Sequence, residues 1–322
     1  MILLLAGTAS GGHFLPAYRM GKLLRYNGRD VQLAVFGKNN YYYDDWIQYF
    51  DNISSFKRFL HVHRNKIDTT ISFGSRDIIL PSLTAKKITG RLWIHEQNVI
   101  PGKANKLLMY FADKILLSFY ETDHFLPSTY SNKIHVVGYP VDEYTFNDCD
   151  DKKFKKQWGI PEDKKIILLM GGSKGSVEIN TIASVVYRNI HDRKIDNIFI
   201  IWQRGGKNTL LYSRYGISFG FSTEIGCFEK IADLIIARGG AGTIAELTYL
   251  RKNALLIPLR GLALDHQYFN AVYSGFPVFG IDSLVFDTIY DALMGNLNIE
   301  QGRLKIMDYA SISELLGGRE KL

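Results

Sequence analysis

Short runs of β-branched and leucine residues alternate with longer amphipathic stretches along the whole chain of 322 residues. Such alternation is typical of βαβ units, in which helices connect parallel strands. The helices that the apolar spacing predicts include Pro16–Tyr26 and Ala104–Phe111. The predicted strands are Ile2–Ala6, Val31–Phe36, Thr69–Phe73, Leu92–His95, Lys114–Leu117, Ile134–Val137, Ile166–Met170, Asn197–Trp202, Leu234–Ala237, Ala254–Ile257 and Val278–Phe279.

The strand pattern begins a second time after residues 138–150, a segment without periodicity. We therefore expect two α/β domains, residues 1–142 and residues 143–322, each with a Rossmann-like, doubly wound parallel sheet. Two such domains leave an interdomain cleft beside the carboxyl ends of their strands, where sheets of this class bind ligands.

Composition excludes several classes of protein. Hydrophobic residues make up 46% of the chain and charged residues 22%, so a sizeable core is expected and disorder is excluded. Cys149 and Cys227 cannot form a disulfide framework or a cysteine-based zinc site, which favours a reducing compartment. No apolar run reaches the ~18–20 residues that span a bilayer. Because Met1–Ala6 also lacks the features of a signal peptide, we expect a soluble, intracellular protein.

Positive charge is concentrated in the first half. Residues 1–142 contain 17 Lys and Arg against 11 Asp and Glu, whereas residues 143–322 contain 22 against 21. This asymmetry indicates that the first half faces an anionic partner, either nucleic acid or a membrane surface. An ordinary solvated surface is the alternative, and charge alone does not choose among the three.

Three glycine-rich loops, residues 6–13, 170–176 and 237–243, follow predicted strands and open predicted helices. Glycine lets the backbone approach a ligand closely, and the amides of a helix N-terminus favour an anion, so the loops predict a phosphorylated ligand. None of them has the G-x-G-x-x-G pattern of a dinucleotide site or the pattern of a P-loop. Glu246, on the helix after the third loop, can hold the ribose diol of a nucleotide or only complement the helix dipole.

Read together, the motifs carry a more specific signal than any single loop. The strings are Ser10–His13 with Pro16 and Ala17, His95–Asn98 with Pro101, Gly102 and Asn105, Gly171–Ser173 with Gly175 and Asn180, Arg238–Ala241 with Thr243 and Glu246, and Pro258, Asp265–Gln267, Asn270 and Ala271. In this order and at this spacing they resemble the motifs of the MurG-type glycosyltransferases.

The resemblance implies the GT-B fold and an inverting transferase that uses neither a metal nor a cofactor. The family transfers N-acetylglucosamine from UDP-N-acetylglucosamine to a polyprenyl-diphosphate-linked muramyl-peptide, which converts lipid I to lipid II in peptidoglycan and cell-wall synthesis. The C-terminal domain is then expected to bind the nucleotide-sugar donor, and the N-terminal domain to meet the lipid-linked acceptor at an anionic membrane surface. The expected location is cytoplasmic, peripherally attached to the cytoplasmic face of the cell membrane, with no nucleic-acid partner.

The same resemblance suggests roles for single residues. His13 is the candidate base for an acceptor hydroxyl because imidazole titrates near neutral pH; a packed or helix-capping histidine is the alternative. Glu96 is either a competing base or the group that orients His13. Ser173 is expected to hold the diphosphate, Glu246 the ribose and Gln267 the sugar. The residues expected to bind the donor are Ser10, Gly11, Gly12, Asn98, Gly172, Ser173, Arg238, Ala241, Gly242, Thr243, Glu246, Asp265, His266 and Gln267.

Two departures from the family pattern concern the ligands. Tyr139 and Asp142 stand where the family usually has Asn and Arg. A cation that would serve the donor is therefore missing, and Arg238, Arg204 or Lys174 can replace it. The family's Gly-Gly-Tyr-x-Ser loop is here residues 73–77, which makes a related GT-B transferase with another polyprenyl-diphosphate-linked acceptor the main alternative. A membrane-recruitment subunit without activity and a sugar-nucleotide epimerase are further alternatives.

A membrane-binding segment is expected over residues 76–93, where apolar residues and cations are mixed in the more positive half. An ordinary amphipathic core helix is the alternative reading. The residues expected to form the patch are Ile78, Ile79, Leu83, Lys86, Lys87, Arg91 and Trp93.

Overall fold

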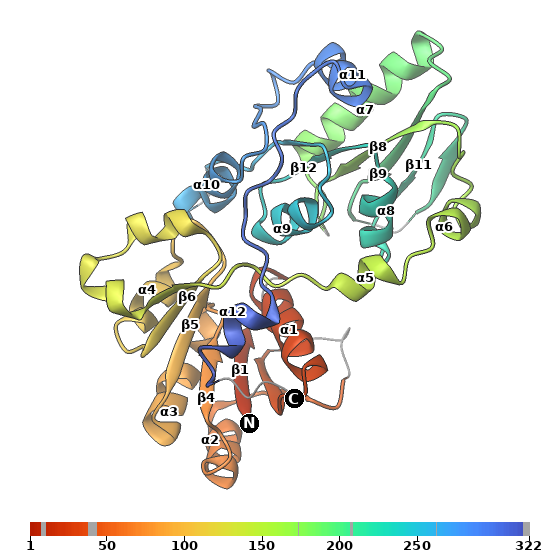
Figure 1. Cartoon of the computed structure of the whole chain (residues 1–322). Coiled ribbons are helices and arrows are strands. Elements are labelled where there is room, and N and C mark those ends of the chain that lie inside the picture. Colours follow the sequence, from red (N-terminus) through yellow and green to blue (C-terminus); the bar gives the residue numbers. More distant parts are fainter. Residues whose placement is uncertain (8–10, 38–43, 173, 207–208, 262, 318–322) are drawn as a thin grey trace. The chain divides into compact units, whose positions relative to one another are not determined.

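The computed structural model describes residues 1–7, 11–37, 44–172, 174–206, 209–261 and 263–317. The chain forms two compact units (Figure 1). Unit 1 consists of Met1–Asp142 and of the segment that begins at Leu304, and unit 2 consists of Glu143–Arg303. The division after Asp142 coincides with the expected one, whereas the last segment had been assigned to the second domain.

The last segment joins unit 1 through backbone pairing. The Met307 amide donates to the Tyr139 carbonyl, and the Tyr139 amide donates to the Lys305 carbonyl, each over 2.9 Å. A side chain at Gly138, whose φ is +92°, would collide with the backbone of residues 305–307. The short helix α12 (Tyr309–Ser313) continues this segment and buries Ile312.

Seven parallel strands form the sheet of unit 1, in the order β3-β2-β1-β4-β5-β6-β7. All six strands predicted in this half are present, and β3 was not predicted. The strands are β1 (Ile2–Gly7), β2 (Val31–Phe36), β3 (Ile47–Phe50), β4 (Thr69–Ser72), β5 (Leu92–Glu96), β6 (Lys114–Leu117) and β7 (Ile134–Val136).

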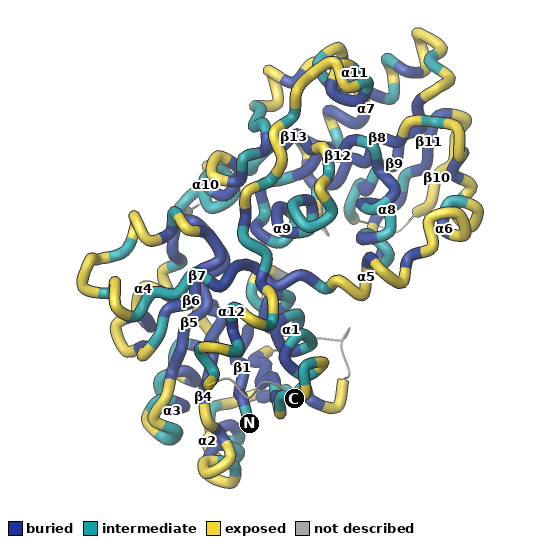
Figure 2. The backbone as a smooth tube through the Cα atoms, viewed as in Figure 1, coloured by how far each residue is buried: buried dark blue, intermediate teal, exposed yellow. Residues whose placement is uncertain are grey.

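Helices cover both faces of this sheet, and its central strands β1, β4 and β5 are buried (Figures 1 and 2). Because side chains alternate between faces along a strand, Leu4 packs with α1 (Gly11–Tyr26) while Leu3 and Leu5 pack with α2 (Ile53–His63). The second face also carries α3 (Ile79–Thr89) and α4 (Lys103–Met109). The other elements are the 3₁₀ helices η1 (Arg76–Ile78), η2 (Tyr120–Phe125) and η3 (Ser128–Lys133).

Unit 2 contains a sheet of six strands in the order β10-β11-β9-β8-β12-β13, parallel except for the β10–β11 hairpin. Neither hairpin strand was predicted, and the run at Val278 forms only an isolated bridge to Leu256. The strands are β8 (Lys165–Met170), β9 (Ile198–Gln203), β10 (Leu211–Ser213), β11 (Gly216–Phe219), β12 (Leu234–Ala237) and β13 (Ala254–Leu256). The helices are α5 (Glu143–Asn147), α6 (Asp151–Gln157), α7 (Val177–Asp192), α8 (Ile225–Ile231), α9 (Ala241–Tyr249), η4 (Ala263–Asp265), α10 (His266–Tyr273) and α11 (Phe286–Met294).

The two cysteines, from which no disulfide framework was expected, form one disulfide. Cys149, between α5 and α6, is bonded to Cys227 in α8, with Cα atoms 5.8 Å apart. Phe154 of α6 packs edge-on against Phe228 of α8, so the core of unit 2 brings these segments together. The pairing depends on tertiary contact between positions 78 residues apart, which composition does not reveal.

Both sheets reverse their strand order once. In unit 1 the chain builds outward from β1 through β2 and β3, then returns through α2 to place β4 on the other side of β1. In unit 2 it builds from β8 through β9 and β11, then returns through α8 to place β12 on the other side of β8. Doubly wound sheets bind ligands at such reversals, which are called topological switch points. Two doubly wound α/β domains, as predicted, are therefore confirmed.

None of the helices in the described residues has the length and apolar character needed to cross a bilayer.

Candidate active site

His13 lies in the first turn of α1, which begins five residues earlier than predicted and contains Pro16. Its ring atom Nδ1 is 2.9 Å from the carbonyl oxygen of Phe73, in the loop after β4. Because a carbonyl oxygen only accepts hydrogen bonds, Nδ1 carries the proton, and Nε2 of the neutral ring keeps its lone pair. The contact bridges the two loops at the switch point of unit 1 and leaves Nε2 in the state that a general base requires.

The loop that orients His13 is itself strained. Gly74 and Ser75 have φ values of +81° and +89°, and Ser75 is not a glycine. The Ser75 hydroxyl is buried, lacks a hydrogen-bond partner in the described part of the chain, and fills the space that a side chain at Gly7 would need. Backbone strain of this kind is held in place by the surrounding structure and clusters at functional sites.

Glu96, at the end of β5, is buried and fully hydrogen-bonded. Its Oε1 accepts from the amide (2.9 Å) and Nδ2 (3.2 Å) of Asn98, and its Oε2 accepts from the Gly102 amide (3.0 Å) and Asn105 Nδ2 (2.8 Å). A carboxylate has about four acceptor positions, so these bonds leave none for a substrate proton. Glu96 organises the loop after β5, and the Phe73 carbonyl is the group that orients His13.

His95, beside Glu96, belongs to the interior. Its Nε2 donates to the Gly138 carbonyl over 3.3 Å, its Nδ1 accepts from Gln97 Nε2 over 3.2 Å, and its ring lies against that of Phe73. Burial lowers the pKa of His95 to about 4, against a smaller opposing effect of the bond to Gly138. The His95 ring is therefore neutral at physiological pH, and it packs against Phe73 in the loop after β4.

The residues expected to bind the donor are divided between the units. Gly11 and Gly12 open α1 in unit 1, and Asn98 in the same unit has its side-chain amide bonded to Glu96. The side-chain amide of Asn98 therefore has a partner in its own loop. Ser10 and Ser173 lie outside the described residues. The remaining ones are in unit 2: Gly172, Arg238, Ala241, Gly242, Thr243, Glu246, Asp265, His266 and Gln267.

The loops after β8 and β12 meet at the switch point of unit 2. Gly172, in the first loop, has a φ of +83°, and the second loop leads into α9, whose N-cap is Gly240. Ala241, Gly242 and Thr243 form the first turn of α9, where the backbone N–H groups have no partner within the helix. The two loops are linked by an ion pair of 3.0 Å between Arg238 Nη1 and Glu178 Oε2. This arrangement suits an anion such as a diphosphate.

Glu246 lies in the second turn of α9 and is partly buried. Helix-dipole effects fall off within the first turn, so the dipole alternative does not explain this carboxylate. A position one turn inside the helix, on the same element as the anion-binding N–H groups, suits a ribose next to a diphosphate.

The N-terminus of α10 packs against the loop that follows β12. Leu264 and Asp265 have φ values of +70° and +41°, and Asp265 Oδ1 accepts from the Gly261 amide over 2.8 Å. His266 and Gln267 begin the helix, and the Gln267 carbonyl oxygen leaves no room for a side chain at Gly239. Gln267 Oε1 accepts from the Leu259 amide over 3.0 Å, so this oxygen satisfies a backbone N–H group, and the NH₂ group remains the part of the side chain that can face a ligand.

The prediction of a membrane-binding patch over residues 76–93 is wrong for its apolar residues. Ile78 and Trp93 are buried in the core of unit 1, and the half-buried Ile79 and Leu83 pack against the cluster around β5 and β6. The segment comprises η1, α3 and β5 rather than one helix, so its apolar residues serve the sheet. The core-helix alternative is correct.

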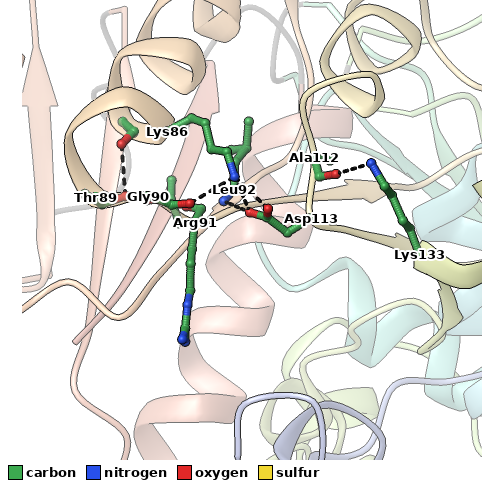
Figure 3. Close-up of polar contacts among 10 residues, drawn as sticks. Lys86, Thr89, Gly90, Arg91, Leu92, Ala112, Asp113 and Lys133 are labelled. Carbon is green, nitrogen blue, oxygen red and sulfur yellow. Dashed lines mark hydrogen bonds and ion pairs between the residues drawn. The ribbon is translucent and has the colours of Figure 1, made fainter.

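The cations of that segment divide into two kinds. Lys86 Nζ lies 2.6 Å from Asp113 Oδ1 and 2.9 Å from the Gly90 carbonyl oxygen, as Figure 3 shows. Asp113 also accepts from the Leu92 amide, so Lys86 ties the end of α3 to β5. Lys87 and Arg91 are exposed, and Arg91 points away from this cluster in Figure 3.

Asp142, which departs from the family pattern, also has a charged partner in its own unit. Asp142 Oδ2 lies 2.6 Å from Lys22 Nζ of α1, within unit 1. The Asp142 carboxylate therefore links the end of unit 1 to α1, and this position supplies no cation for the donor. Tyr139 is buried beside the last segment of the chain.

Comparison with known proteins gives matches in both units. Residues 47–117 match the glycosyltransferase family 28 N-terminal domain, and residues 166–275 match the glycosyltransferase family 28 C-terminal domain. A relative from Rickettsia felis is 30% identical over 297 residues, which cover 84% of this chain and 82% of that protein. It is named UDP-N-acetylglucosamine–N-acetylmuramyl-(pentapeptide) pyrophosphoryl-undecaprenol N-acetylglucosamine transferase.

Solved structures share the fold. MurG of Acinetobacter baumannii superposes with a TM-score of 0.63 at 19% identity, covering 92% of this chain and 90% of that one. A putative UDP-N-acetylglucosamine 2-epimerase from Listeria monocytogenes superposes with a TM-score of 0.65 at 9% identity, covering 92% and 88%. These likenesses confirm the predicted GT-B architecture.

The buried His95 makes the stability of the chain depend on pH. The unfolded chain binds a proton at this residue near pH 6.5 and the folded chain only near pH 4, so the free energy of unfolding falls as the pH drops between these values. The full effect is about 3 kcal/mol. We expect denaturant titrations of the full chain at pH 7.5 and 4.5 to show a smaller pH effect in His95→Gln than in wild type. Equal pH effects in both proteins would contradict the assignment.

Proposed function

The chain belongs to glycosyltransferase family 28, and from this premise we propose that it transfers N-acetylglucosamine from UDP-N-acetylglucosamine to a polyprenyl-diphosphate-linked muramyl-peptide. The observation that carries the proposal is that both switch points hold the groups this transfer needs. Unit 1 presents an oriented imidazole, and unit 2 presents a cation, a helix N-terminus and a carboxylate on the same helix.

Each unit supplies different groups to the proposed reaction. Nε2 of His13 takes the proton from the acceptor hydroxyl, whose oxygen attacks C1 of the donor sugar and displaces UDP with inversion. The negative charge that develops on the leaving diphosphate is stabilised by the N–H groups that open α9 and by Arg238. Glu246 holds the ribose, and Gln267 contributes its NH₂ group to the sugar. The chemistry is assigned to protein groups and uses no cofactor.

The acceptor of this transfer has one alternative with an observation in its favour. The loop after β4 carries the strained Ser75 followed by an exposed Arg76, where the family pattern has other residues. This loop orients His13, so it lies where the acceptor hydroxyl must sit. Product masses from UDP-N-acetylglucosamine and a panel of polyprenyl-diphosphate-linked sugars distinguish a muramyl-peptide acceptor from a related one.

We propose a membrane-facing surface on α4 in place of the one predicted over residues 76–93. Lys103, Lys106, Leu107 and Tyr110 recur at the spacing of one helix face, and all four are exposed, Tyr110 at 72%. Asn105, Leu108 and Met109 form the opposite, buried face. Residues 97–112 contain two lysines and no Asp or Glu. Exposed apolar residues beside lysines suit an anionic bilayer, which supports the proposal of peripheral attachment to the cytoplasmic face of the membrane.

Removal of the base should affect turnover rather than donor binding. We expect His13→Ala to lower kcat roughly 10²–10⁴-fold and to leave the Kd for UDP unchanged by calorimetry. His61→Ala, which removes an exposed histidine of α2, is the matched control and should retain wild-type kcat. A kcat of His13→Ala within a few-fold of wild type would exclude His13 as the base.

Removal of the ribose carboxylate should act on the donor alone. Hydrogen bonds to a charged group contribute about 1.5–3 kcal/mol, so Glu246→Ala should raise the donor KM by roughly 10- to 100-fold. The variant should also lose the preference for a ribose donor over its 2′-deoxy analogue. Glu162→Ala, an exposed glutamate of the same unit, is the control. An undiminished preference for ribose in Glu246→Ala would place the sugar elsewhere.

The α4 surface predicts a charge-dependent membrane attachment. Each lysine near an anionic bilayer contributes about 1 kcal/mol, so Lys103→Gln with Lys106→Gln should lower liposome co-sedimentation roughly tenfold or more at low salt. Activity on a short-chain, detergent-free acceptor should persist. The matched control is Lys87→Gln with Arg91→Gln, which removes two exposed cations of the earlier prediction. If the control loses binding and the α4 variant keeps it, the attachment surface is not α4.

A further inference from the structure

An ion pair connects the two loops that meet at the switch point of unit 2. Strands β8 and β12 are paired with Met170 opposite Ala237, so the residues that follow them leave the sheet side by side. Glu178 stands in the first turn of α7, after the β8 loop, and Arg238 directly follows β12. Their side chains meet at 3.0 Å between Arg238 Nη1 and Glu178 Oε2.

Arg238 is held in a largely buried position. Its side chain is 11% exposed, and that of Glu178 is 35% exposed. A guanidinium has five N–H donors in a fixed fork, of which the bond to Glu178 uses one. A buried cation needs a counter-ion, and the carboxylate of Glu178 supplies it while leaving donors of the fork for another anion.

Hydrogen bonds at the N-terminus of α7 hold Glu178 in place. Its own backbone N–H, the Ser176 hydroxyl at 2.8 Å and the guanidinium of Arg238 all hold its pKa below the usual range. Ser176 is the N-cap of α7, and its Oγ also accepts from the Ile179 amide. The carboxylate is therefore charged at neutral pH and attached to a rigid helix end.

The other cations considered for the donor are engaged or unsupported. The residue at 142 is an aspartate paired with Lys22 in unit 1. The guanidinium of Arg204 donates to the Thr209 carbonyl in its own loop, and Lys174 is exposed. Arg238 is the cation that a defined partner holds at the switch point, beside the first turn of α9.

We infer that Glu178 is a positioning residue that holds Arg238 toward the diphosphate of the nucleotide-sugar donor. This inference rests on the proposed function, because it takes the ligand of unit 2 to be a nucleoside diphosphate. Glu178 touches no substrate; it fixes the direction in which the free N–H groups of Arg238 point. A displaced guanidinium loses the aligned contact with a phosphate, which a charge in the same region without fixed geometry does not replace.

The test compares UDP, which has the diphosphate, with uridine, which lacks it. Kd values for both ligands are measured by calorimetry on the full chain for wild type, Glu178→Ala, Arg238→Ala and the double variant. Glu178→Ala should weaken UDP roughly tenfold and leave uridine unchanged, so the ratio of the two affinities falls. In the Arg238→Ala background, removal of Glu178 should have no further effect on UDP, because the residue acts through Arg238.

Two matched variants separate positioning from stability and from charge. Asp287→Ala breaks an exposed ion pair with Arg193 in the same unit and should leave both affinities unchanged. Glu178→Gln keeps the acceptor oxygen for Arg238 and should retain most of the UDP preference.

Each remaining outcome has a defined meaning. An unchanged ratio in Glu178→Ala, or equal losses for UDP and uridine, overturns the positioning role. A gain in UDP affinity also overturns it and shows that the carboxylate competes with the diphosphate. Wild type that binds uridine and UDP equally, or binds neither, refutes the proposed donor site itself rather than the role of Glu178.

Discussion

The reversal of strand order in each parallel sheet is the constraint on which both sites depend. All strands of a parallel sheet end at the same edge, and a crossover helix normally separates the loops of neighbouring strands. Where the order reverses, the crossovers leave in opposite directions and two strand-to-helix loops stand beside each other. In this chain those places are β1 with β4 and β8 with β12, and the groups assigned to chemistry lie on one of these loops or on the helix that follows, apart from Gln267 at the start of α10.

The two reversals are bridged by different physical interactions, and the difference matches their tasks. In unit 1 the imidazole of His13 bonds to the Phe73 carbonyl through Nδ1, which in the neutral tautomer leaves the lone pair on Nε2 for proton transfer. In unit 2 an arginine bonds to Glu178, which compensates a buried cation while leaving part of its donor fork for an anion. Next to the contact between His13 and Phe73, the neutral His95 and the fully hydrogen-bonded Glu96 hold the neighbouring loops in place.

The sequence predicts the architecture well because parallel strands buried on both faces are continuous apolar runs. β10 escapes prediction because its residues are exposed and paired antiparallel at the edge, and β3 because it is a short edge strand of mixed polarity. Motif spacing places Glu246 on the correct helix, whereas His13, expected in the loop before the helix Pro16–Tyr26, lies in the first turn of α1. It cannot reveal the Glu178–Arg238 pair, the disulfide or the partner of Asp142, since each joins residues far apart in sequence through the fold.

Net charge illustrates why composition alone misplaces a surface. The excess of cations in residues 1–142 suggested a membrane patch over residues 76–93, which include Lys86, Lys87 and Arg91. In the fold, however, Lys22 pairs with Asp142, Lys86 with Asp113, and Lys133 donates to a backbone carbonyl, so these cations stabilise unit 1 internally. Attraction to a bilayer depends on cations that lack such partners and lie beside exposed apolar side chains. α4 meets both conditions because the sheet buries one of its faces, and residues 97–112 contain two lysines and no Asp or Glu, which is a property of this segment rather than of the domain's net charge.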